Sequence, residues 1–131
     1  MKRLTEMIAS AFRSHREDWQ VSRSSVEVTL GAGVRKHKVH FARRGNDYVL
    51  TSSVTKVRRS GRSRRERARL AWERNSSQDL VTFGIDENSR LVGQIRHKAD
   101  TIHEAELIFL ITTLARECDS LEYYLTGHDS R

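Results

Sequence analysis

The strand-like segments of this chain are joined by links that are too short for a crossover, and this strongly restricts its fold. Alternating apolar residues predict a strand over residues 26–30, and apolar, β-branched and aromatic residues predict strands over residues 34–42, 48–57, 80–85 and 91–95. Within each group the links are a few residues long and hold glycine or polar turn residues. A parallel pair needs a connection of roughly a dozen residues or more, so neighbouring strands of each group must run antiparallel.

Helical spacing of apolar residues appears at both ends of the chain. The N-terminal segment predicts a helix over residues 4–12, and a capping box at residues 101–104 introduces a long final helix that reaches about Leu125. A second capping box at residues 63–66 precedes a predicted short helix over residues 67–74. The apolar face of the final helix comprises Ile102, Ala105, Ile108, Phe109, Ile111, Thr112, Ala115, Cys118, Leu121 and Leu125.

These elements follow one another in the order α-β-β-β-α-β-β-α. The sequence therefore predicts an α+β fold, with an antiparallel five-stranded sheet and helices packed on one face. The first and last helices carry most of the helical apolar surface, so we expect them to cover the sheet. A length of 131 residues is typical of one domain, which we expect to span residues 1–131.

This order, together with the C-terminal sequence, resembles the type III secretion chaperone-like fold, which the YbjN family of bacterial sensory-transduction regulators shares. The resemblance rests on a strand at residues 81–86, a turn, a second strand, and a polar-capped helix that ends at residues 118–125. It extends over about residues 79–125, and earlier residues match only in element order. The resemblance implies a non-enzymatic domain that binds polypeptide through apolar sheet and helix surface, often as a dimer.

The positive charge of the chain is concentrated in one connector. The whole sequence has 24 Lys and Arg against 17 Asp and Glu, a formal net charge of +7. Residues 56–74 hold nine of the basic residues and two of the acidic ones, so the rest of the chain is balanced. Secretion chaperones are typically acidic, and this segment is where the chain differs from them. The arginines that form the candidate binding segment are Arg58, Arg59, Arg62, Arg64, Arg65, Arg67 and Arg69.

Three uses of this segment agree with its composition. It can be a solvated connector, because a charged link between elements is expected to be exposed. It can dock an acidic protein partner or an acidic patch on a second copy of the chain. It can also bind nucleic acid, since arginine forks match phosphate and release counterions.

The residues that could carry chemistry form no recognisable constellation. His37 and His40 are three apart on a predicted strand, so they point to opposite faces and are expected to be surface or edge residues. Cys118 lies on the apolar stripe of the last helix, which favours a small buried hydrophobe over a reactive thiol. Asp119 and Glu122 share a helix face, which we expect to be solvated.

We therefore expect no catalytic residues, no metal, no cofactor and no small-molecule substrate, and we expect that the protein is not an enzyme. The lone cysteine cannot form an internal disulfide, and no run of 18 apolar residues occurs, so we expect a cytoplasmic protein without a membrane span. The predicted function is a protein-binding or regulatory module that binds a protein partner or itself, with a homodimer favoured. The alternative is a nucleic-acid-associated domain that uses residues 58–69. Trp19, Tyr123 and Tyr124 are each predicted to be core residues rather than part of a self-association surface.

Overall fold

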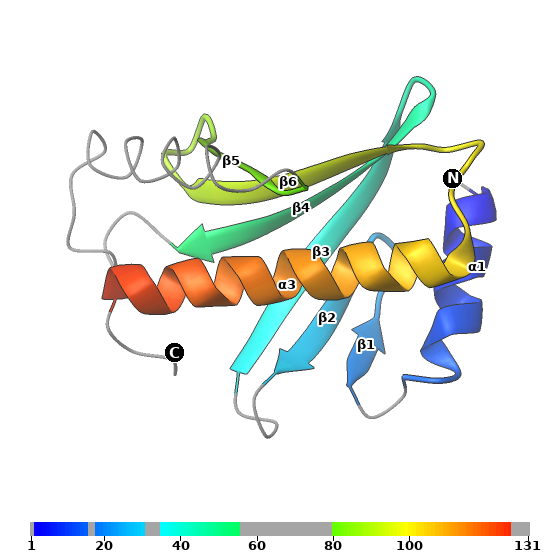
Figure 1. Cartoon of the computed structure of the whole chain (residues 1–131), viewed down its shortest axis with the longest axis horizontal. Coiled ribbons are helices and arrows are strands. Elements are labelled where there is room, and N and C mark those ends of the chain that lie inside the picture. Colours follow the sequence, from blue (N-terminus) through cyan, green and yellow to red (C-terminus); the bar gives the residue numbers. More distant parts are fainter. Residues whose placement is uncertain (1, 16–17, 31–34, 56–79, 127–131) are drawn as a thin grey trace.

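A computed structural model of the chain describes residues 2–15, 18–30, 35–55 and 80–126. Within these residues, antiparallel strands form a six-stranded sheet, and a long helix crosses one face of it (Figure 1). The strand order is β1-β2-β3-β4-β6-β5. The predicted helix over residues 67–74 lies outside the described residues. The elements are α1 (Lys2–Phe12), β1 (Trp19–Val21), β2 (Ser25–Leu30), β3 (Arg35–Arg44), β4 (Asp47–Thr55), β5 (Thr82–Ile85), β6 (Leu91–Lys98) and α3 (Glu104–Thr126).

The predicted α+β class, the antiparallel pairing and both terminal helices are confirmed, but the prediction of five strands is wrong. The additional strand is β1, which pairs with β2 through Trp19 opposite Val28 and Val21 opposite Val26. Three residues are too few to display an alternating pattern in the sequence. Trp19 is nevertheless buried, at 4% exposure, so the core residue predicted at this position is confirmed.

Two tight turns set the register of the hairpins. Gly45 adopts a left-handed φ of 62° between β3 and β4, a conformation that costs glycine little. In the turn between β5 and β6, the Asp86 side chain accepts hydrogen bonds from the backbone N–H groups of Asn88 and Arg90, at 2.9 and 2.8 Å. Ser89 of the same turn has a φ of 60°. The predicted hairpin over these strands is confirmed.

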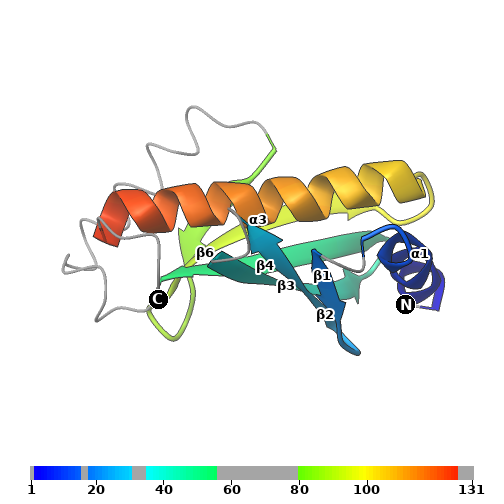
Figure 2. The same ribbon diagram turned by 90° about the horizontal axis from the view of Figure 1, so that it is seen from below.

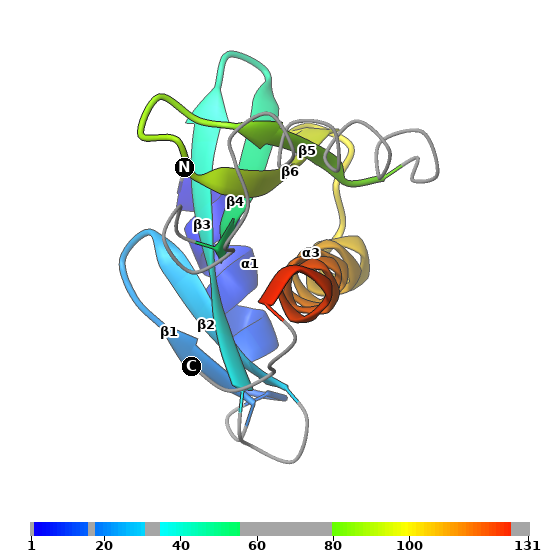
Figure 3. The ribbon, with the colours of Figure 1, turned by 90° about the vertical axis from the view of Figure 1, so that its left-hand side faces the viewer.

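Helix α3 packs against β2, β3, β4 and β6, and α1 packs against α3 and β1 (Figures 2 and 3). Viewed along α3, the sheet curves around the helix (Figure 3). The buried stripe of α3 includes Leu107, Ile111, Leu114 and Leu121, each at 0% exposure. Burial of one such side chain contributes roughly 1.5–3 kcal/mol, so this stripe is a main source of the cohesion between helix and sheet.

Small residues let α3 approach the sheet closely at one point. Ser52 of β4 lies opposite Gly93 of β6, and Cys118 of α3 sits above them. The Cys118 thiol donates a hydrogen bond of 3.7 Å to the backbone oxygen of Ser52. A Cβ atom at position 93 would lie only 2.8 Å from the Cys118 sulfur, so glycine is needed there for space.

The start of α3 differs in detail from the predicted capping box at residues 101–104. The helix begins at Glu104, and the backbone N–H of His103 donates to the Glu106 carboxylate at 3.2 Å. The box therefore lies two residues further along the chain. The guanidinium of Arg3, on α1, donates to the backbone oxygens of Ala99 and Ile102. These bonds link the segment that leads into α3 to the N-terminal helix. In the described part of the chain, no helix is long and apolar enough to cross a membrane.

Candidate functional site

The arginines predicted to bind a polyanion or an acidic partner all lie outside the described residues. This applies to Arg58, Arg59, Arg62, Arg64, Arg65, Arg67 and Arg69. The described residues nevertheless contain a polar cluster at the C-terminal end of α3, which the sequence alone does not reveal.

The cluster begins with a buried histidine on β3. The strand alternates, so that His37, Val39 and Phe41 face α3 whereas the residues between them are exposed. The prediction that His37 and His40 point to opposite faces is confirmed. His40 is exposed, but the expected surface position of His37 is wrong, because its exposure is 7%.

The same inward direction brings His37 against two carboxylates of α3. Its Nε2 atom lies 3.3 Å from an oxygen of Asp119 and 3.3 Å from an oxygen of Glu122. The other Asp119 oxygen accepts a hydrogen bond of 2.9 Å from Nε of Arg35, two residues before His37 on the same strand. The predicted solvated face is therefore wrong for Asp119, which is 9% exposed, and Glu122 is partly buried.

The cluster combines side chains of opposite charge. The Arg35 guanidinium pairs with Asp119, and Asp119 and Glu122 both approach the same nitrogen of His37. An imidazole nitrogen carries either one hydrogen or one lone pair, and it faces two acceptors at the same 3.3 Å distance. The arrangement is therefore suited to a cation placed between the three groups, whether a proton or a metal ion.

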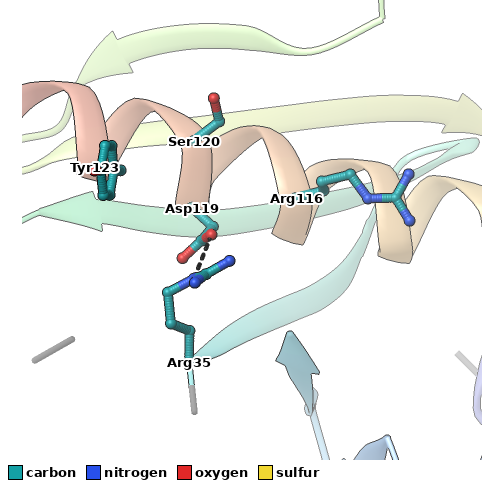
Figure 4. Close-up of a pocket in the computed structure, with 5 residues that line it drawn as sticks. All are labelled: Arg35, Arg116, Asp119, Ser120 and Tyr123. Carbon is teal, nitrogen blue, oxygen red and sulfur yellow. Dashed lines mark hydrogen bonds and ion pairs between the residues drawn. The ribbon is translucent and has the colours of Figure 1, made fainter. Parts of the chain in front are cut away.

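An open cavity adjoins the cluster. Its volume is about 480 Å³, and Arg35 and Asp119 form part of its wall together with Arg116, Ser120 and Tyr123. Figure 4 shows the Arg35–Asp119 ion pair spanning from β3 to α3, beside the Tyr123 ring. The cavity thus gives solvent and small ions a path to the Asp119 carboxylate.

The outer side of α3 carries exposed aromatic residues. Phe109, Tyr123 and Tyr124 are 61%, 52% and 59% exposed, so the prediction of core positions for the two tyrosines is wrong. Phe109 and Ala105 were placed on the predicted apolar face, and both are exposed as well. Apolar residues extend around too much of this helix for the sequence to show which side packs on the sheet and which side faces solvent.

Cys118 is buried at 0% exposure, as predicted from its place on the apolar stripe. Burial raises the pKa of its thiol from 9.0 to about 12, although hydrogen bonds to Ser52 and Gly93 act in the opposite direction. A thiol with this pKa stays protonated near neutral pH, and the thiolate is the nucleophilic form. Cys118 is therefore a packing residue rather than a nucleophile.

Basic side chains gather on the face of the sheet that points away from α3. Lys36 and Lys38 alternate with the buried residues of β3 and are exposed, and Arg44 and Arg96 are exposed on the same face. The Arg96 guanidinium forms an ion pair of 3.2 Å with Asp47. The basic and acidic residues that balance one another along the sequence are thus unevenly distributed in space.

The sequence matches no protein-family model, and no curated protein matches it. Its fold is similar to that of several solved structures. A chain in the crystal structure of the ExsC–ExsE complex superimposes with a TM-score of 0.67 at 10% identity, over 95% of each chain. A chain of the heterodimeric ExoU–SpcU complex from the type III secretion system of Pseudomonas aeruginosa gives 0.56 at 15% identity, over 82% of this chain and 87% of that one.

The third similar structure is the complex of the Yersinia pestis type III secretion chaperone SycH with a stable fragment of YscM2. It gives a TM-score of 0.56 at 10% identity, over 88% of this chain and 97% of that chain. The predicted chaperone-like fold is therefore confirmed. The resemblance to the YbjN family stays a prediction.

Proposed function

We propose that this chain is a non-enzymatic module that binds a polypeptide partner, with the outer side of α3 as part of the contact surface. One observation carries the proposal: the fold resembles three solved structures, each of a complex between two different proteins. The exposed aromatics on α3 supply a surface of the right chemistry, because aromatic residues are enriched where proteins bind one another.

These aromatics lie on one side of the helix. Phe109 and Tyr123 are 14 residues apart, which at 3.6 residues per turn places them within about 40° of each other and about 21 Å apart along the axis. Arg116 and Ser120 lie between them at heptad-like spacing and are also exposed. A partner segment laid along this stripe would contact an aromatic residue at each end and polar groups in the middle.

A photo-reactive benzoylphenylalanine at position 109 tests the proposal in the intact chain. The matched control carries the same group at Leu80, which is 38% exposed and does not belong to α3. We expect a cross-linked polypeptide from position 109 and none from position 80. The cross-linked partner is then purified and titrated calorimetrically against Phe109→Ser and Leu80→Ser variants.

Truncation of an aromatic hot-spot residue in a protein contact costs about 2 kcal/mol or more, which corresponds to a weakening of more than tenfold. We expect Phe109→Ser to lose at least this much affinity and Leu80→Ser to bind like the wild type. Equal cross-linking from both positions, or unchanged affinity of the Phe109 variant, would contradict the proposed surface.

The regulatory role and the homodimer are finer parts of the same proposal. Light scattering on a size-exclusion column tests self-association, and a dimer would have twice the 15.2 kDa mass of one chain. A mass of 15.2 kDa that does not change with concentration would refute the dimer and leave the partner-binding proposal intact.

Binding of nucleic acid through residues 58–69 is the second candidate. The concentration of arginine supports it, as do the exposed Lys36 and Lys38 on the uncovered face of the sheet. Mobility shifts on random DNA and RNA at two salt concentrations provide the test, because phosphate contacts weaken steeply with salt. Absence of binding at low salt would remove this candidate. Where binding occurs, charge reversal of Arg64, Arg65, Arg67 and Arg69 should abolish it.

A further inference from the structure

We infer that His37, Asp119 and Glu122 form a binding site for a divalent transition-metal ion of the zinc type, at the junction of β3 and α3. Each side chain offers one ligand atom, and these three atoms lie within 4.8 Å of one another. The site goes beyond the partner-binding proposal and does not depend on it.

The distances fit a metal coordinated by nitrogen and oxygen. Zinc lies about 2.0–2.2 Å from such ligands, so neighbouring ligand atoms of a tetrahedron are separated by about 3.4 Å. His37 Nε2 lies 3.3 Å from each carboxylate oxygen, which is close to this separation. Only the distance between the two carboxylates has to be adjusted. Glu122 has the longer side chain of the two and is 18% exposed, so it is the group that can move.

The surroundings hold two of the ligands in place before any ion arrives. Asp119 is oriented by the 2.9 Å hydrogen bond from Arg35, and carboxylate ligands in metal sites are usually fixed by such a second contact. His37 is 7% exposed and fixed on the strand beneath the helix. Folding has therefore already ordered these two side chains, so ion binding does not have to restrict them further.

The donor set indicates which ion the site takes. Imidazole nitrogen suits zinc, cobalt, nickel and copper, whereas calcium and magnesium prefer oxygen ligands alone and a larger number of them. Two of the three ligands are carboxylates, whose charge is opposite to that of a divalent cation, and this favours its binding. The cavity beside Asp119 brings solvent to one of the three ligands.

Calorimetric titration of the full chain with Zn²⁺, and separately with Mg²⁺, tests this site. The ligand variant is Glu122→Gln, which keeps the shape of the partly exposed side chain and removes its charge. The matched control is Glu106→Gln, on the same helix, because the Glu106 carboxylate lies 3.5 Å from Nε2 of His97 and is 47% exposed. We expect one Zn²⁺ per chain, no heat with Mg²⁺, and a loss of affinity of at least about tenfold in Glu122→Gln alone.

The imidazole ¹⁵N resonances give an independent readout that does not require a variant to fold. Zn²⁺ should shift the Nε2 signal of His37 and leave the signal of His97 unchanged. Either of two results would overturn the inference: a His37 resonance that stays fixed in excess Zn²⁺, or Zn²⁺ affinity that depends on Glu106 and not on Glu122. The second result would assign the binding to the pair of His97 and Glu106.

Discussion

The close approach of α3 to the sheet at Gly93 leads to a sharp prediction about stability. Replacement of Gly93 by alanine adds a Cβ atom 2.8 Å from the Cys118 sulfur, 3.1 Å from a ring carbon of Phe83 and 3.2 Å from a methyl carbon of Leu114. Ordinary van der Waals contacts begin near 3.4 Å. All three neighbours are buried at 3% exposure or less, so none can swing into solvent to relieve the contact.

Two opposing terms determine the size of the effect. Overpacking of a core by one methyl group costs about 1–3 kcal/mol. The backbone φ of Gly93 is not left-handed, so alanine also gains about 0.4–1 kcal/mol by restricting the unfolded chain. We therefore expect Gly93→Ala to lower the free energy of unfolding by about 1–2 kcal/mol, as measured by urea denaturation.

A double-mutant cycle isolates the contact with the sulfur. Cys118→Ala alone should cost about 1–2 kcal/mol through the space that it leaves. In the double variant the new methyl group occupies part of that space, so the combined loss should be smaller than the sum by about 1 kcal/mol. Gly84→Ala is the matched control, because no atom lies within 4 Å of its added Cβ and its φ is not left-handed. Strict additivity, or a Gly93 variant as stable as the Gly84 variant, would refute the packing argument.

Three further predictions concern contacts of α1 and α3 and are checked by urea or thiol assays. Asp119→Ala removes the hydrogen bond from Arg35 and the contact with His37, and it should lower the free energy of unfolding by about 1.5–3 kcal/mol. Asp47→Ala, whose pair with Arg96 is exposed, should cost less than about 1 kcal/mol. Equal losses would contradict the burial argument. Arg3→Lys should lower the free energy of unfolding by about 1–2 kcal/mol, because an ammonium cannot reproduce the two guanidinium hydrogen bonds to the segment before α3. An unchanged free energy of unfolding would contradict this role of Arg3. The folded-state pKa of Cys118, about 12, lies above its ordinary 9.0, so the contribution of this thiol to stability should be constant below pH 9 and fall as the pH rises from 9 to 12. Labelling by a disulfide reagent at neutral pH should then occur only through unfolding, and rapid labelling of the native chain would contradict the assigned burial.

The sequence predicts the fold correctly wherever a segment is long enough to show a clear pattern of apolar residues. Alternation indicates β3, aromatic and β-branched residues indicate β4, and more than five turns of helical spacing indicate α3. Strand β1 could not be found this way, because its three residues are defined by hydrogen bonding to β2 rather than by a local pattern. The capping box of α3 was placed two residues too early for a related reason. Both Thr101 and His103 precede a glutamate by three positions, and only the packed chain selects between them.

The charge distribution shows how an average along the sequence can mislead. Outside residues 56–74 the basic and acidic residues balance in number. Alternation of β3 nevertheless sends Lys36 and Lys38 to the uncovered face, whereas Asp119 and Glu122 lie against the other face. Balance in number along the sequence therefore does not determine which charges become neighbours in space.

The sequence alone does not reveal the polar cluster, because its two halves lie on different elements. His37 and His40 point to opposite faces of β3, and Asp119 and Glu122 share one face of α3, so neither pair indicates a site by itself. One physical argument connects His37 on β3 with the acidic residues on α3. The alternation that buries Val39 and Phe41 also buries His37, and a buried imidazole needs a polar partner on the element that covers it. Residue 119 follows the buried Cys118 directly, so the acidic residues at this end of α3 were the available partners. An inward polar residue on a half-buried strand is therefore best paired with the charged residues that border the apolar stripe of the covering helix.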